Sequence, residues 1–150
     1  MLRLIVPAEV EREFKAAAKK AFPAETFAYV LGRMIGDTVE IAELWWPDED
    51  ELEEACNTWR VNVAPHWIVE AAEAGKEQGL IPLGDLHSHP YEGKDLITDR
   101  AQSEADIDRV SRMVIGGICT VQRRQRKGKS YLRAGIRWWP PLIPMRVERE

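Results

Sequence analysis

The sequence is poor in the residue types that mark secreted and membrane proteins. It has only two cysteines among 150 residues, which is too few for a disulfide framework and favours a reducing compartment. No apolar run approaches the roughly 20 residues that a membrane-spanning helix needs. The short apolar stretch at residues 4–6 is followed by Pro7 and charges, unlike a signal peptide. We therefore expect a soluble cytoplasmic protein with no membrane partner.

The sequence also lacks a basic surplus. Its formal net charge is −4, which argues against a general nucleic-acid binder. Apolar residues make up 45% and charged residues 31% of the chain, an ordinary globular balance. A length of 150 residues fits one compact domain, residues 1–150, with no internal repeat or linker that would divide it.

Hydrophobic periodicity predicts an α/β domain in which helices flank a mixed or mostly antiparallel sheet. A first helix should open at Pro7, with Glu11 on its solvent face, and end at Pro23; a second should span residues 65–78 and a third residues 104–111. Acidic residues 48–54, residues 90–102 and the basic residues 122–129 are predicted to be loops. Predicted strands cover residues 2–6, 26–31, 38–46, 59–63, 80–89, 113–121 and 131–139, with a further edge strand in the proline-rich end.

One strand carries the chemically informative motif. His87 and His89 are two residues apart near the end of the predicted strand at residues 80–89, so both side chains point to the same side. Two imidazoles on one side can bind one metal ion, and a catalytic zinc site takes three protein ligands plus water. An isolated pair of this kind is also common at strand ends without any metal, so a third ligand decides.

The stretch Ser103-Glu104-Ala105-Asp106 opens the predicted third helix. Asp106 at a helix start can be aimed back at the two histidines and would complete a zinc site. The alternative is structural, because Ser103 with an acidic residue three positions on resembles a capping box. The two interpretations are compatible.

His87-Ser88-His89-Pro90 followed by Ser103-Glu104-Ala105-Asp106 resembles the motif of the JAMM, or JAB1/MPN/Mov34, zinc metalloproteases. Residues 25–32, from Glu25 to Gly32, are similar to the early strand of that family. The resemblance covers residues 2–137 and implies a cytidine-deaminase-like JAB/MPN fold, with length and order typical of stand-alone prokaryotic members. It also implies one Zn²⁺ per chain on His87, His89 and Asp106, with Glu25 as general base and Ser103 as oxyanion donor.

Active members of this family hydrolyse the peptide or isopeptide bond after the C-terminal tail of a ubiquitin-like protein. The resemblance therefore implies a zinc isopeptidase with a ubiquitin-like protein or its conjugate as partner. Because some relatives have lost the metal, a non-catalytic module that binds such a tail is the alternative, and a small-molecule amidase on the same site is a third.

The spacer between His89 and Ser103, residues 90–102, is longer than the family's usual one. Asp99 and Asp95 lie nearer the usual distance, but neither has a serine three positions before it. Asp106 is thus the first candidate for the third ligand and Asp99 the second. The long loop is either a substrate-shaping element or a tolerated insertion.

Other conspicuous residues have structural interpretations. His66, between Pro65 and Trp67 at a helix start, is predicted to be structural, and Cys119 to be a core residue. The pairs Trp45-Trp46 and Trp138-Trp139 should each place one ring outward. These outward rings are candidates for a homodimer surface, with core and edge packing as the alternative.

Overall fold

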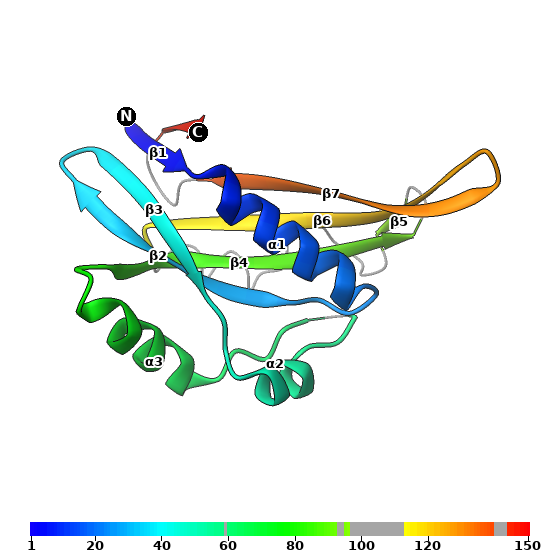
Figure 1. Cartoon of the computed structure of the whole chain (residues 1–150), viewed down its shortest axis with the longest axis horizontal. Helices are drawn as coiled ribbons and strands as arrows, with labels where there is room; N and C mark the ends of the chain where they lie inside the picture. Colours follow the sequence, from blue (N-terminus) through cyan, green and yellow to red (C-terminus); the bar gives the residue numbers. More distant parts are fainter. Residues whose placement is uncertain (59, 93–94, 97–112, 140–143) are drawn as a thin grey trace.

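An eight-stranded mixed sheet forms the centre of the molecule (Figure 1). In this computed structural model, the described residues are 1–58, 60–92, 95–96, 113–139 and 144–150. The strand order is β7-β6-β4-β2-β3-β1-β8, and the short β5 pairs with β4. The strands are β1 (Leu2–Val6), β2 (Phe27–Ile35), β3 (Thr38–Trp45), β4 (Ile81–Glu92), β5 (Asp95–Leu96), β6 (Ile115–Arg126), β7 (Lys129–Trp139) and β8 (Met145–Arg149). The helices are α1 (Ala8–Ala21), α2 (Glu49–Ala55) and α3 (Pro65–Lys76).

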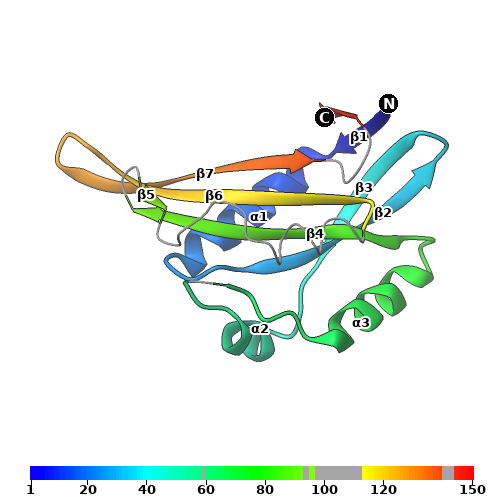
Figure 2. The same cartoon turned by 180° about the vertical axis from the view of Figure 1, so that it is seen from behind.

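The helices lie on opposite faces of the sheet (Figures 1 and 2). Alternation along β2 sends Ala28 and Val30 to the face covered by α1, where they join a core with Phe14. Phe27, Tyr29 and Leu31 point to the other face and pack with Trp67 of α3. Within the described residues, no helix is long and apolar enough to span a membrane.

The strand β4 lies at the middle of the sheet and contacts three other strands. It pairs antiparallel with β2 and β5 and parallel with β6. At Gly84 the parallel neighbour comes so close that an added Cβ would lie 1.9 Å from the carbonyl oxygen of Ile115. Glycine is therefore required there by the approach of two backbones. The predicted strand at residues 80–89 is confirmed and extends three residues further, to Glu92.

The two chain ends lie side by side at one edge of the sheet (Figure 1). β8 pairs parallel with β1, which confirms the predicted edge strand. Across this pair Arg3 Nε donates to Glu148 Oε2 at 2.7 Å, and this hydrogen bond holds the pKa of the Glu148 carboxyl below its ordinary value.

Several local predictions were wrong, including the loop predicted over residues 90–102, where β4 continues to Glu92 and β5 lies at Asp95–Leu96. Residues 49–55 form the helix α2 rather than a loop, because Asp48 caps it by accepting from the backbone N–H groups of Asp50 and Glu51. Residues 60–63 form no strand, only a single bridge between Cys56 and Val61. The basic loop is short, since β6 and β7 continue to Arg126 and Lys129 on either side of a two-residue turn.

Glu11 is buried on α1, whereas helical periodicity predicted it on the solvent face. Its carboxylate accepts from Trp138 Nε1 at 3.0 Å and from Arg149 Nε at 3.0 Å. Partners contributed by β7 and β8 thus compensate its burial, and they come from residues 127 and 138 positions away in the sequence.

The described tryptophans of the pairs Trp45-Trp46 and Trp138-Trp139 pack against other side chains and do not project into solvent. Trp46 stacks on Phe14 of α1 with ring centroids 5.5 Å apart, and its Nε1 donates to Glu13. Trp45 packs partly buried on the opposite face, and Trp138 is buried. The side chain of Trp139 and the predicted helix at residues 104–111 lie outside the described part of the chain.

We predict that Gly84→Ala destabilises the protein by at least about 2 kcal/mol, because the methyl group would force β4 away from β6. Chemical denaturation monitored by circular dichroism measures the change. Gly135→Ala is the matched control, since its Cβ would meet only Thr120 Oγ1, at 4.0 Å, and should change stability by less than about 0.5 kcal/mol. Equal stability of the two variants would contradict the close approach.

Candidate metal centre

The strand β4 places both histidines of the H-x-H motif on the α3 side of the sheet. His87 is 1% exposed and His89 is 3% exposed. Residue pairing with β2 aligns His87 with Phe27, which packs against Trp67 of α3. The two imidazoles are thus in a water-poor interior, where a polar ring needs a compensating partner.

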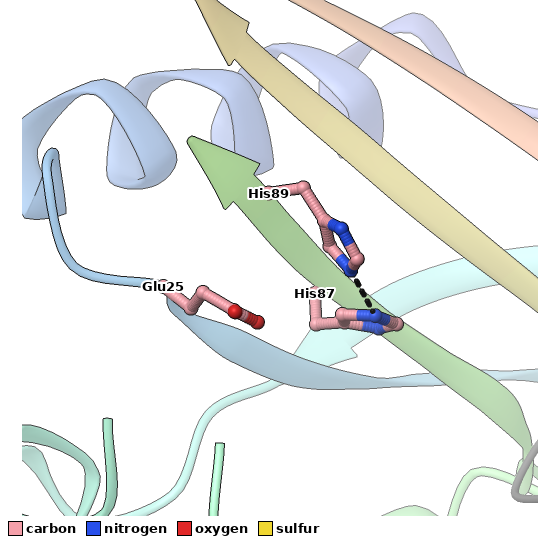
Figure 3. Close-up of side chains that lie close together, drawn as sticks. All are labelled: Glu25, His87 and His89. Carbon is pink, nitrogen blue, oxygen red and sulfur yellow. Dashed lines mark hydrogen bonds between the residues drawn. The ribbon is translucent and has the colours of Figure 1, made fainter. Parts of the chain in front are cut away.

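The two rings converge with the carboxylate of Glu25 (Figure 3). His87 Nε2 and His89 Nε2 are 3.0 Å apart. One ligand atom from each of Glu25, His87 and His89 lies within 4.8 Å of the others. Two imidazole ligands of a tetrahedral zinc ion lie about 3.3 Å apart, so the observed separation is close to that of a metal-bound pair.

A hydrogen-bonded junction between two strands positions Glu25. Glu25 lies two residues before the start of β2, and its backbone N–H donates to the carbonyl oxygen of Asn57 at 2.9 Å. The next residue, Thr26, donates its N–H to Ser88 Oγ at 2.8 Å and accepts from the Ser88 N–H at 3.1 Å. Ser88, between the two histidines, therefore fixes the start of β2 beside them.

The carboxylate of Asp85 also belongs to the centre, although the motif comparison did not single it out. Asp85 Oδ1 is 3.2 Å from His87 Nδ1, and both side chains are almost completely buried. A carboxylate at this nitrogen holds the Nδ1–H tautomer, in which Nε2 is the nitrogen that binds a metal ion. The signal was present in the sequence, because Asp85 lies two residues before His87 and so shares its face of the strand.

A cavity of about 490 Å³ lies beside Glu25. Its walls are mainly apolar and include Ala21, Trp46 and Leu52, together with the thiol of Cys56. Burial, with a smaller contribution from the negative charge of Glu25, raises the pKa of Cys56 to about 12. The thiol is therefore neutral at physiological pH and is a poor nucleophile.

The predicted site residues divide into two groups. The structure brings Glu25, His87 and His89 together. Ser103, Asp106 and the alternative ligand Asp99 lie outside the described residues, and Asp95 is on β5. His66, on α3, is exposed and contacts Glu51 of α2 at 2.5 Å. Cys119 is buried in the core, as predicted.

The donor set at the centre suits zinc. Two buried imidazole nitrogens with a nearby carboxylate match the ligand types of catalytic zinc sites, in which a water occupies the remaining position. The Asp85–His87 contact supplies the outer carboxylate that such histidines usually have. Calcium or magnesium would prefer a set made only of oxygen atoms.

Comparison with known proteins agrees with this architecture. Residues 7–129 match the family described as prokaryotic homologs of the JAB domain. The solution structure of protein DSY2949 from Desulfitobacterium hafniense is similar, with a TM-score of 0.57 and 18% identity, covering 100% of this chain and 94% of that one. The crystal structure of AF2198, a JAB1/MPN domain protein from Archaeoglobus fulgidus, gives a TM-score of 0.47 and 17% identity over 98% of both chains. No curated protein matches this chain.

A mixed sheet with helices on both faces and a buried H-x-H strand near its middle defines an α/β protein. The family match spans well over half of the residues. The chain therefore belongs to the prokaryotic homologues of the JAB domain.

We predict that Asp85→Asn weakens zinc binding by about 10-fold or more, because the amide no longer stabilises the Nδ1–H tautomer of His87. Competition with a chromogenic chelator measures the zinc dissociation constant. The control Asp37→Asn removes an acidic side chain in the exposed turn between β2 and β3 and should leave the affinity unchanged. An Asp85→Asn protein that is folded and binds zinc as tightly as the wild type would rule out this role.

Proposed function

We propose that this JAB-domain protein is a zinc-dependent isopeptidase or peptidase that hydrolyses the bond after the C-terminal tail of a ubiquitin-like protein. The observation that carries the proposal is the buried convergence of His87, His89 and Glu25 in a chain of this family. Burial of two imidazoles beside a carboxylate costs free energy of folding, because polar groups lose their contacts with water. Such costly clusters are typical of functional sites, which supports a reacting centre here.

The proposed ligands are His87, His89 and Asp106, with Ser103 as donor to the oxyanion of the tetrahedral intermediate. A bound zinc ion would supply a Lewis acid and lower the pKa of a coordinated water toward about 7. The described residues provide the means to hold the first two ligands, since Asp85 orients His87 and pairing with β2 and β6 fixes β4.

Glu25 is the proposed general base. Its carboxylate takes a proton from the attacking water and then delivers it to the nitrogen of the departing amine, so that water adds across the amide bond. The junction of Thr26 with Ser88 holds this carboxylate beside the imidazoles during both transfers. The thiol of Cys56, on the wall of the adjacent cavity, is neutral and does not compete with the attacking water as a nucleophile.

We predict that Glu25→Gln lowers the turnover rate by about 10²–10⁴-fold while zinc remains bound, because the amide keeps the shape of the side chain but cannot accept the proton. The substrate is a ubiquitin-like protein whose C-terminal carboxyl group is amide-linked to a fluorophore. Release of the fluorophore gives the rate, and elemental analysis of the purified protein gives the zinc content.

The control Glu43→Gln makes the same change at an exposed position of β3 and should retain full activity. Loss of zinc together with activity in Glu25→Gln would identify Glu25 as a ligand and contradict its role as base. A wild-type protein that binds the tail but never cleaves it would instead establish a non-catalytic binding module.

A further inference from the structure

A second group of metal-binding side chains lies away from the β4 centre, between α2 and α3. It consists of Glu51, His66 and Glu70, and one ligand atom from each lies within 4.8 Å of the others. None of these residues belongs to the centre formed by His87, His89 and Glu25. This group, which we call the interhelical cluster, is partly open to solvent, with 51% of the His66 side chain and 41% of the Glu51 side chain exposed.

The cluster follows from the geometry of two helices. His66 and Glu70 are four residues apart on α3, so their side chains are neighbours on one face of that helix. Glu51 comes from the first turn of α2 and brings its Oε1 to 2.5 Å from His66 Nε2. A histidine and a glutamate one helical turn apart offer two neighbouring donors, and the second helix supplies a third.

The charge around the cluster favours a cation. Five of the seven residues of α2 are acidic, and its last turn contains no basic residue to offset them. α2 also has no fully buried residue, so polar contacts with α3 contribute to its attachment. A divalent ion shared by the two helices would relieve the repulsion among these carboxylates and link α2 to the sheet through α3.

A cavity of about 310 Å³ adjoins the cluster and is lined by Glu51, Glu54, Asn62 and Trp67. Trp67 is 1% exposed, and its Nε1 has no hydrogen-bond acceptor among the described residues. The cavity wall thus combines carboxylate and amide oxygens with a buried donor. A cavity of this kind can hold water molecules, whose oxygen atoms would complete the coordination of an ion bound by only three side chains.

We propose that Glu51, His66 and Glu70 bind a second divalent metal ion, of the zinc class, that fastens α2 to α3. One imidazole with two carboxylates suits Zn²⁺ or Co²⁺ better than Mg²⁺ or Ca²⁺, which prefer oxygen ligands alone. Ligand atoms of a tetrahedral zinc ion lie about 3.3 Å apart. The ligand atoms of the cluster, which lie within 4.8 Å of one another, therefore need to approach by at most about 1.5 Å, which rotation of exposed side chains permits.

The site has a structural connection to the candidate base. α2 ends at Ala55, and two residues later the carbonyl oxygen of Asn57 accepts the backbone N–H of Glu25. An ion that holds α2 against α3 therefore restrains the segment on which the position of Glu25 depends. Metal binding at the cluster itself does not require that the β4 centre be catalytic.

Equilibrium dialysis of the full chain against Zn²⁺ tests the proposal. We expect roughly two equivalents per chain for the wild type and roughly one for His66→Ala, because a site left with two exposed carboxylates binds zinc weakly. Glu73→Gln removes a charge from α3 outside the cluster and is the matched control, expected to keep roughly two. Circular dichroism confirms that each variant is folded.

A variant with both His87→Ala and His89→Ala separates the two centres. It should retain roughly one equivalent, and this remaining equivalent should be lost when His66→Ala is added. If the β4 centre bound no zinc, the proposed hydrolytic function would fail, yet the wild type would still bind roughly one ion that depends on His66.

Hydrogen exchange gives a readout specific to the helices. Zinc should slow the exchange of the α2 amides at least about 10-fold in the His87→Ala, His89→Ala protein, and should have no such effect once His66 is replaced. Equal zinc stoichiometry in the wild type and His66→Ala, or α2 exchange that is indifferent to zinc, would overturn the proposal.

Discussion

The pairing of β4 with neighbours on both sides is the constraint on which the rest of the structure depends. β2 runs antiparallel to it and β6 runs parallel to it, so the ends of β4 cannot move independently of the sheet. Because Gly84 allows the backbone of Ile115 to approach, β6 can follow β4 along most of its length. The histidines therefore project from a segment whose position and direction are fixed, and every other feature of the centre is arranged around them.

Around that strand, the polar groups of the centre are supported in pairs. Asp85 lies against His87, and Ser88 exchanges two hydrogen bonds with Thr26. Buried polar groups without partners cost free energy, so each of these contacts stabilises the fold while it orients a functional side chain. The same interactions therefore determine both the stability of the fold and the geometry of the site. A substitution at Ser88, for example, would alter both.

Sequence patterns predicted the parts of this protein that depend on local chemistry. The aromatic and β-branched residues of β2, the proline that opens α3 and the i, i+2 spacing of His87 and His89 were sufficient for these predictions. Charge density favours a loop where the structure has α2, because the cap at Asp48, and not the density of charge, determines the local conformation. The burial of Glu11 could not be predicted, since Arg149 reaches it only after β8 has paired with β1.

The same limit applies to the site. The resemblance indicated Glu25, but its neighbourhood to His87 depends on the register between β2 and β4, which no local pattern specifies. Asp85 was within reach of strand periodicity alone. The interhelical cluster, in contrast, joins residues of two helices whose packing is a tertiary property, and the sequence alone predicts only a structural role for His66 at a helix start.

The long β6–β7 hairpin projects from one end of the sheet, while the acidic α2 lies beneath its middle (Figure 1). Basic side chains crowd the hairpin tip, among them Arg124, Arg126 and Lys129. A net charge of only −4 therefore conceals a separation of charge between the basic hairpin tip and the acidic α2. Such a separation exerts a torque as well as a net force on any charged molecule that diffuses past, so it favours some orientations before any side chains touch.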